Sequence, residues 1–122
     1  MKRIKILVLG ASGFIGKNIA LNLSKNKKFS VTGTYFKNKV SIKNVKIIKT
    51  NLTIKKDVDK VIKGNDIVIQ AAATTSGAKD IIQKPYIHVN DNAIINSMVT
   101  RSCYDYQIKH VVFFSCSIMY NP

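Results

Sequence analysis

The stretch Ile-Lys-Ile-Leu-Val-Leu-Gly-Ala-Ser-Gly-Phe-Ile-Gly, residues 4–16, decides how the rest of the chain is interpreted. An apolar run leads into three glycines spaced three residues apart, which predicts a strand, a tight turn and the start of a helix. Gly10 then permits the sharp turn, Gly13 lets a ligand approach the backbone, and Gly16 lets the helix pack closely. Unpaired N–H groups and the positive end of the helix dipole would point out of the turn, so we expect it to bind the pyrophosphate of a dinucleotide.

Outward from this turn, strand-like and helix-like segments alternate. Helices are predicted over Phe14 to Asn26, Ile54 to Lys63, where Gly64 caps the end, and Val89 to Tyr106. The last helix is expected to carry Ile94, Ile95, Met98, Val99 and Cys103 inward, and residues 74–85 are expected to form a loop. Strands are predicted at Arg3 to Leu9, Phe29 to Tyr35, Val45 to Lys49, Asp66 to Ala73 and His110 to Ser115.

Strands that alternate with helices favour a parallel sheet with right-handed crossovers. The predicted fold class is α/β, a Rossmann-type doubly wound sheet with five strands in the order 3-2-1-4-5. We expect residues 1–122 to form one NAD(P)-binding domain.

The composition limits the function classes. The net charge is +14, from 20 Lys and Arg residues against 6 acids, but lysines occur in every segment, so we expect no nucleic-acid partner. We also expect no membrane association, because no apolar run is long enough for a span, and a cytoplasmic location, because no secretory signal is visible. The two histidines and two cysteines lack metal-ligand spacing, so neither a metal site nor a disulfide is predicted.

Five short segments, spread over the whole chain, resemble the sequence motifs of one family. They are Gly10 to Gly16, Asn51-Leu52 after the third strand, Gly64 to Ala73, Asn90 near the head of the long helix, and Phe114 to Tyr120. In this order they resemble the extended short-chain dehydrogenase/reductase family of NAD(P)-dependent sugar-nucleotide epimerases and dehydratases. The resemblance implies hydride transfer between a carbon of a nucleotide-activated sugar and the nicotinamide.

The resemblance also implies a set of cofactor-binding residues, with Asn51 and Leu52 at the edge of the adenine. These residues are Gly10, Ser12, Gly13, Phe14, Ile15, Gly16, Tyr35, Lys37, Asn51, Leu52, Ala71, Ala72, Ala73 and Asn90.

The end of the second strand departs from the family pattern. Members of the family often have an Asp there that accepts from the ribose hydroxyls, whereas residues 35–39 contain no acid. An acid would repel a 2′-phosphate and a lysine would attract it. We therefore favour NADP over NAD, with Lys37 or Lys39 as the phosphate partner; the alternative is that both are solvated loop lysines.

A second departure lies at the end of the fifth strand. Where the family has a Ser or Thr beside the reacting sugar oxygen, an ungapped count back from Tyr120 gives Cys116. A thiol is a poorer hydrogen-bond donor, so the catalytic candidates are Cys116, Ser117 and Ser115, of which we favour Ser117. The alternative is that Cys116 is only a small buried residue.

The catalytic Tyr-x-x-x-Lys pair of the family has no counterpart after Ser115. We therefore expect the chain to be the cofactor-binding N-terminal part of a longer enzyme, without its substrate domain and inactive by itself. The alternative is a non-catalytic sensor or scaffold of the same fold that binds a dinucleotide. We expect apolar surface to be exposed at the fifth strand and a homodimer to form through such surface.

Overall fold

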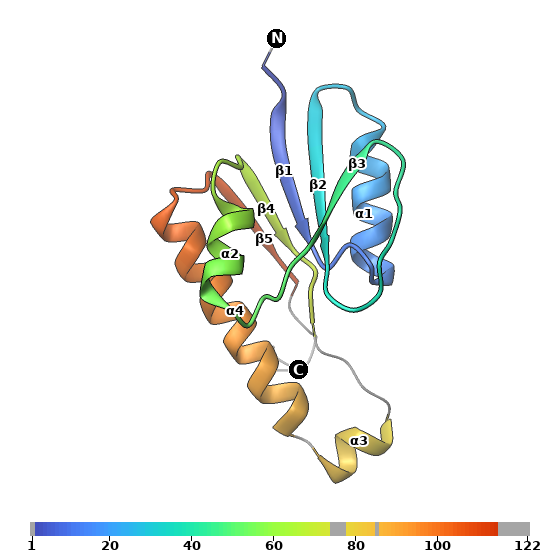
Figure 1. The fold of residues 1–122 in the computed structure, drawn as a ribbon, viewed down its shortest axis with the longest axis vertical. Helices are drawn as coiled ribbons and strands as arrows, with labels where there is room; N and C mark the ends of the chain where they lie inside the picture. The colour runs from blue at the N-terminus through green and yellow to red at the C-terminus, as the bar shows by residue number, and fades with distance from the viewer. Residues whose placement is uncertain (1, 74–77, 85, 115–122) are drawn as a thin grey trace, which may run out of the picture.

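The computed structural model describes residues 2–73, 78–84 and 86–114, which form a five-stranded parallel sheet (Figure 1). The strand order is β3-β2-β1-β4-β5, so the predicted α/β fold class and strand order are confirmed. The strands are β1 (Ile4–Leu9), β2 (Phe29–Tyr35), β3 (Val45–Lys49), β4 (Ile67–Gln70) and β5 (His110–Phe113).

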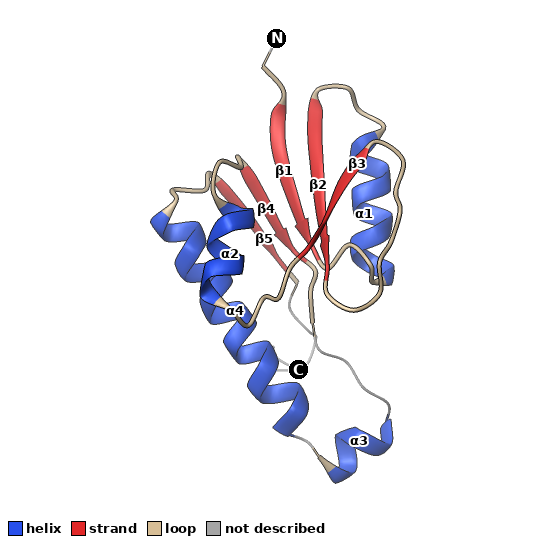
Figure 2. Ribbon diagram, viewed as in Figure 1, coloured by secondary structure: helices blue, strands red, loops and turns tan. Residues whose placement is uncertain are grey.

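Helices cover both faces of this sheet, as Figure 2 shows. On one face lies α1 (Phe14–Ser24); on the other lie α2 (Lys55–Ile62) and α4 (Tyr86–Asp105), and the short α3 (Ala78–Gln83) contacts α4 away from the sheet. Among the described residues, no helix is both long enough and apolar enough to cross a membrane.

The central strand β1 divides the core into two clusters, because its side chains point alternately to the two faces. Ile6 and Val8 pack on the side of α1, whereas Leu7 and Leu9 pack among side chains of α2 and α4. All four side chains are buried, which is typical of an inner strand of a doubly wound sheet.

Two expectations about the helices were wrong. Residues 78–83 form α3 instead of loop, since Ala, Lys, Ile and Gln all support a helical turn and Pro85 then separates α3 from α4. In α4 the side chain of Ile94 is 41% exposed, whereas Ile95, Val99 and Cys103 are buried. Residues spaced by four share one face of a helix, and Ile94 lies about 100° around the axis from Ile95.

The strands β4 and β5 are shorter than predicted, because parallel pairing stops where β1 turns away. Leu9 pairs with Gln70, Gln70 pairs with Phe113, and the chain turns at Gly10. Residues 71–73 therefore follow β4 as extended chain, and Ser115 lies outside the described residues. The carboxyl ends of β1, β4 and β5 consequently lie at the same edge of the sheet.

Strand β5 pairs only with β4 within the described part of the chain and is exposed on both faces. The exposed fractions of Val111, Val112, Phe113 and Phe114 lie between 44% and 49%. The predicted exposure of apolar surface at the fifth strand is thus present.

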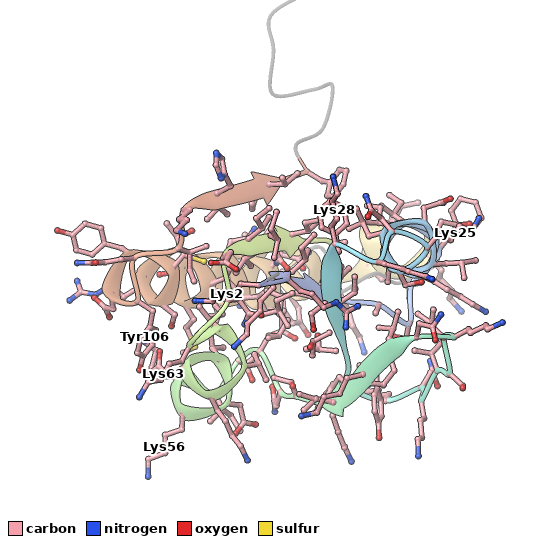
Figure 3. All side chains as sticks on the ribbon, turned by 90° about the horizontal axis from the view of Figure 1, so that it is seen from above. Lys2, Lys25, Lys28, Lys56, Lys63 and Tyr106 are labelled. Carbon is pink, nitrogen blue, oxygen red and sulfur yellow. The ribbon has the colours of Figure 1, made fainter. Side chains whose placement is uncertain are left out.

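Asp66 joins three strands at the opposite, amino edge of the sheet. Its carboxylate accepts a hydrogen bond from the Lys5 N–H (2.9 Å) and lies 3.5 Å from the Lys109 ammonium, and its carbonyl accepts from the Lys109 N–H. Figure 3 looks onto this edge and shows Lys2, Lys28 and Lys63 around it. The hydrogen bond from Lys5, together with the charges of Lys109 and Lys2, lowers the pKa of Asp66 despite its partial burial.

We expect Asp66→Asn to reduce the loss of stability in acid. Because the folded-state pKa lies below the ordinary value of 3.8, the stabilisation is present above that value and is lost as the pH falls through the folded-state value. Urea unfolding from about pH 6 to about pH 2.5 should therefore show a shallower acid decline for Asp66→Asn than for the unaltered chain. The control is Asp91→Asn on the exposed side of α4. An equal acid decline in the free energy of unfolding for Asp66→Asn and for the unaltered chain would show that Asp66 does not stabilise the fold in this way.

Candidate functional site

The glycine turn after β1 is held by the neighbouring strand β2. Gly10 has a φ of +77°, which confirms the predicted sharp turn. Its N–H donates to Thr34 Oγ1 (3.2 Å), and the N–H of Ala11 donates to the carbonyl of Thr34 (2.8 Å). Thr34 is buried, so the turn is fixed to β2 by a residue that the sequence analysis did not single out.

The three glycines of the turn differ in what surrounds them. A Cβ added at Gly10 would lie 2.6 Å from the Ala72 Cα, and one added at Gly16 would lie 2.2 Å from the carbonyl oxygen of Gly10. Both glycines are therefore required by contacts within the chain, and Gly16 packs against the turn itself. At Gly13 a Cβ would meet only the Gly10 oxygen at 3.5 Å, an ordinary contact. The space beside Gly13 is left open to a ligand.

The first turn of α1 leaves backbone donors free. Gly13 is the N-cap residue, no side chain caps the helix, and its first turn contains no acid. The N–H of Gly13 bonds back to the Gly10 carbonyl, but the N–H groups of Ser12, Phe14 and Ile15 have no acceptor among the described residues. The Phe14 side chain is 85% exposed. Free donors at the positive end of a helix favour an anion.

The backbone after β4 forms the other side of this turn. Gln70 is 3% exposed, and its side chain bonds to both the N–H (3.2 Å) and the carbonyl (3.1 Å) of Ala72 and to Asn96 Oδ1 (3.0 Å). Ala71 donates its N–H to the Leu9 carbonyl. Gln70 therefore sets the position of Ala72 against Gly10. In the sequence, this role of Gln70 is indicated only by its being the one amide side chain at the end of a buried apolar strand.

The end of β2 carries positive charge. Tyr35 is half-buried, and its carbonyl accepts from the Thr50 N–H (2.8 Å), which fixes β3 beside it. Lys37 and Lys39 follow on the surface, and in the described part of the chain no acid pairs with either. Because residues 35–39 contain no acid, the ammonium groups of Lys37 and Lys39 are available to an anionic ligand.

Asn51 and Leu52 follow β3 at the same edge. The Asn51 N–H donates to Asp57 Oδ2 (3.3 Å), and its Oδ1 accepts from both the N–H (3.0 Å) and the Oγ1 (2.7 Å) of Thr53. The Leu52 side chain is 7% exposed and packs in the core cluster beneath α2 and α4. A ligand at this edge would therefore contact the backbone of Leu52 and not its side chain.

The other predicted site residues lie apart from the turn or outside the description. Ala73 and Asn90 are exposed, and no described contact joins Asn90 to the glycine turn. The catalytic candidates Ser115, Cys116 and Ser117 lie outside the described residues. The described residues contain no cluster of His, Cys, Asp or Glu that could hold a metal ion.

A separate polar cluster joins α2 to α4. Lys55 forms an ion pair with Asp59 and donates to Ser102 Oγ (2.8 Å), while Ser102 donates to Asp59 Oδ1 (2.5 Å). The hydrogen bonds from Lys55 and Ser102 lower the pKa of Asp59. Nearby, burial raises the pKa of the free thiol of Cys103 to about 11, so this thiol stays protonated. Lys55, Asp59 and Ser102 therefore satisfy one another and link α2 to α4.

Comparisons with known proteins identify the family of this chain. The model of the NAD dependent epimerase/dehydratase family matches residues 6–122. The chain is 29% identical to an uncharacterized UDP-glucose epimerase, YtcB, of Bacillus subtilis, over 96% of this chain and 41% of that protein.

Solved structures share the fold. The UDP-N-acetylglucosamine 4-epimerase of Methanobrevibacter ruminantium, solved with UDP-N-acetylmuramic acid, is 26% identical with a TM-score of 0.80, over 100% of this chain and 41% of that one. The Bordetella bronchiseptica enzyme WbmH, solved with NAD+, is 18% identical with a TM-score of 0.77, over 95% and 40%. The chain thus spans about two-fifths of the length of these relatives.

The family match covers nearly the whole chain, and the strand order and glycine turn belong to the N-terminal Rossmann portion of such proteins. The chain is therefore a member of the NAD-dependent epimerase/dehydratase family within the extended short-chain dehydrogenases/reductases.

Proposed function

We propose that this chain is the cofactor-binding portion of an NAD(P)-dependent epimerase, dehydratase or reductase that acts on a nucleotide-activated sugar. The observation that carries the proposal is the open space at Gly13 beside the free N–H groups of Ser12, Phe14 and Ile15. A dinucleotide fits this donor set, because its pyrophosphate needs several N–H donors and close access to the backbone.

Each part of the carboxyl edge has a role in this proposal. The N–H groups at the start of α1 hold the pyrophosphate, and Gly10 and Gly16 keep the turn that presents them. Residues after β2 and β3 receive the adenosine half, through Tyr35, Lys37, Asn51 and the backbone of Leu52. Small residues after β4, Ala71, Ala72 and Ala73, leave room for the nicotinamide half, with Asn90 beyond them. When bound, the nicotinamide would exchange a hydride with a sugar carbon.

The substrate class is proposed from the relatives, two of which bear the names of UDP-sugar epimerases. Among Ser115, Cys116 and Ser117, we propose that one hydroxyl or thiol holds the reacting sugar oxygen, and we favour Ser117 because a hydroxyl donates more strongly than a thiol. We place the protein in the cytoplasm and propose a homodimer, for which the exposed apolar side chains of β5 are the support. No described contact favours the alternative of a non-catalytic sensor or scaffold.

The proposed cofactor preference is NADP over NAD. Lys37 and Lys39 place two ammonium groups at the end of β2, where a ribose phosphate would lie. The only acid near the ends of β2 and β3 among the described contacts is Asp57, and the Asn51 N–H already occupies one of its oxygens.

Gly13→Ala and Gly64→Ala should have opposite effects. Gly13→Ala should change the free energy of unfolding by less than about 1 kcal/mol, since its Cβ meets no close atom, yet weaken NAD and NADP binding at least about tenfold. Gly64→Ala, at the amino edge with a φ of +84°, should cost about 1 kcal/mol of stability and leave binding unchanged. Calorimetric titration and thermal unfolding of the same samples measure both. Undiminished binding by a folded Gly13→Ala chain, or no binding by the unaltered chain, would refute the proposed site.

Lys37→Ala and Lys39→Ala test the cofactor preference. The unaltered chain should bind NADP more tightly than NAD, and the double variant should lose about three- to tenfold in NADP affinity with little change for NAD. Lys28→Ala, on the opposite edge, controls for the loss of positive charge. Equal or tighter binding of NAD by the unaltered chain would rule out the preference.

A further inference from the structure

We propose that Asn51 presents a hydrogen-bond donor to the nucleobase, so that this site accepts a 6-oxopurine at least as well as adenine. This inference rests on the proposed function, because it takes the adenosine half of a dinucleotide to lie along the ends of β2 and β3. It goes beyond that function by specifying which hydrogen bond recognises the base.

The orientation of the Asn51 amide is fixed by its neighbour Thr53. A backbone N–H can only donate, and the N–H of Thr53 lies 3.0 Å from one terminal atom of the Asn51 side chain. That atom must therefore be the oxygen, Oδ1. The hydroxyl of Thr53 donates to the same oxygen at 2.7 Å, so both of its lone pairs are engaged. The other terminal atom, the NH₂ group of Asn51, then points away from Thr53.

The NH₂ group of Asn51 and the backbone N–H of Leu52 form no hydrogen bond within the described part of the chain. The nearest acid, Asp57, accepts from the backbone N–H of Asn51 instead. Asn51 is half-buried, and its NH₂ group is not among the buried side-chain groups without a partner, so it is accessible to an acceptor on a ligand. The Asn51 side chain therefore offers a donor and no free acceptor.

The sheet places Asn51 and Leu52 where the base would lie. Strand order from the centre outward is β1, β2, β3, and a nucleotide that starts with its phosphates at the β1 turn extends toward β3. Tyr35 pairs with Lys49, and the Thr50 N–H bonds to the Tyr35 carbonyl, so Asn51 lies just beyond the end of β2. The 6-position of a purine lies across the ring system from the sugar. It is the part of the nucleotide that reaches farthest out.

The chemistry of the 6-position then decides which base is accepted. Adenine carries a 6-amino donor, whereas hypoxanthine and guanine carry a 6-oxo acceptor. A donor from Asn51 that faces an amino group leaves two N–H groups unpaired, whereas a 6-oxo group accepts from it. A carboxylate at position 51 would have the opposite preference. Asp has the shape of Asn and can keep both hydrogen bonds from Thr53, so Asn51→Asp replaces the donor by an acceptor and adds a negative charge, which acts on ADP and IDP alike.

The test compares ADP with IDP, its hypoxanthine counterpart, by calorimetric titration of the 122-residue chain. The unaltered chain should bind IDP at least as tightly as ADP. In Asn51→Asp the ratio of the two affinities should move at least about tenfold toward ADP. Asn26→Asp is the matched control, because its Oδ1 also accepts a backbone N–H two residues on, that of Lys28, but at the opposite edge. Its ratio should equal that of the unaltered chain.

Two outcomes would overturn the inference while the proposed function stands: a tenfold or larger preference of the unaltered chain for ADP, or an unchanged ratio in Asn51→Asp. The first needs no variant, so the test does not depend on the folding of Asn51→Asp. Failure of the folded, unaltered chain to bind either nucleotide would instead overturn the proposed function, and the inference with it.

Discussion

The close approach of two backbone segments, at Gly10 and Ala72, is the constraint on which the rest of the structure depends. A Cβ at Gly10 would lie within 2.8 Å of three backbone atoms of Ala71 and Ala72, so only glycine lets the turn after β1 pass the chain leaving β4. Thr34 holds the turn from β2, and Gln70 holds Ala72 from β4. The start of α1 is thereby fixed relative to three strands, and its free N–H groups are preorganised before any ligand arrives.

This arrangement separates the residues that build the edge from those that are left for a ligand. Gly10 and Gly16 are required by close contacts within the chain, and the side chains of Thr34 and Gln70 form their hydrogen bonds within it. The N–H groups of Ser12, Phe14 and Ile15 and the open side of Gly13 have no comparable internal use among the described residues. Substitutions of the first group act on folding, whereas substitutions at Gly13 act on binding.

The sequence was sufficient for features that depend on neighbouring residues. The glycine spacing predicted a sharp turn at Gly10, where φ is +77°, and the alternation of strand-like and helix-like segments predicted all five strands and their order. The sequence was insufficient for features that depend on contacts between residues far apart in the chain. Strand β4 ends at Gln70 because β1 turns away at Gly10, and Thr34 matters because it faces that turn. The helix α3 was missed because a six-residue segment beside Pro85 has too little periodicity to distinguish a helix from a loop.

Electrostatics connects the cofactor edge to the composition of the chain. The +14 charge is distributed over every segment, and at the ends of β2 and β3 the described contacts place one acid, Asp57, beside it. One oxygen of Asp57 accepts from the Asn51 backbone N–H, and the Asn51 side chain itself contributes a donor. An edge rich in donors and ammonium groups favours ligands that carry negative charge and acceptor groups. The contribution of the lysines and N–H groups to specificity therefore comes from ligand phosphates and from carbonyl or ring-nitrogen acceptors.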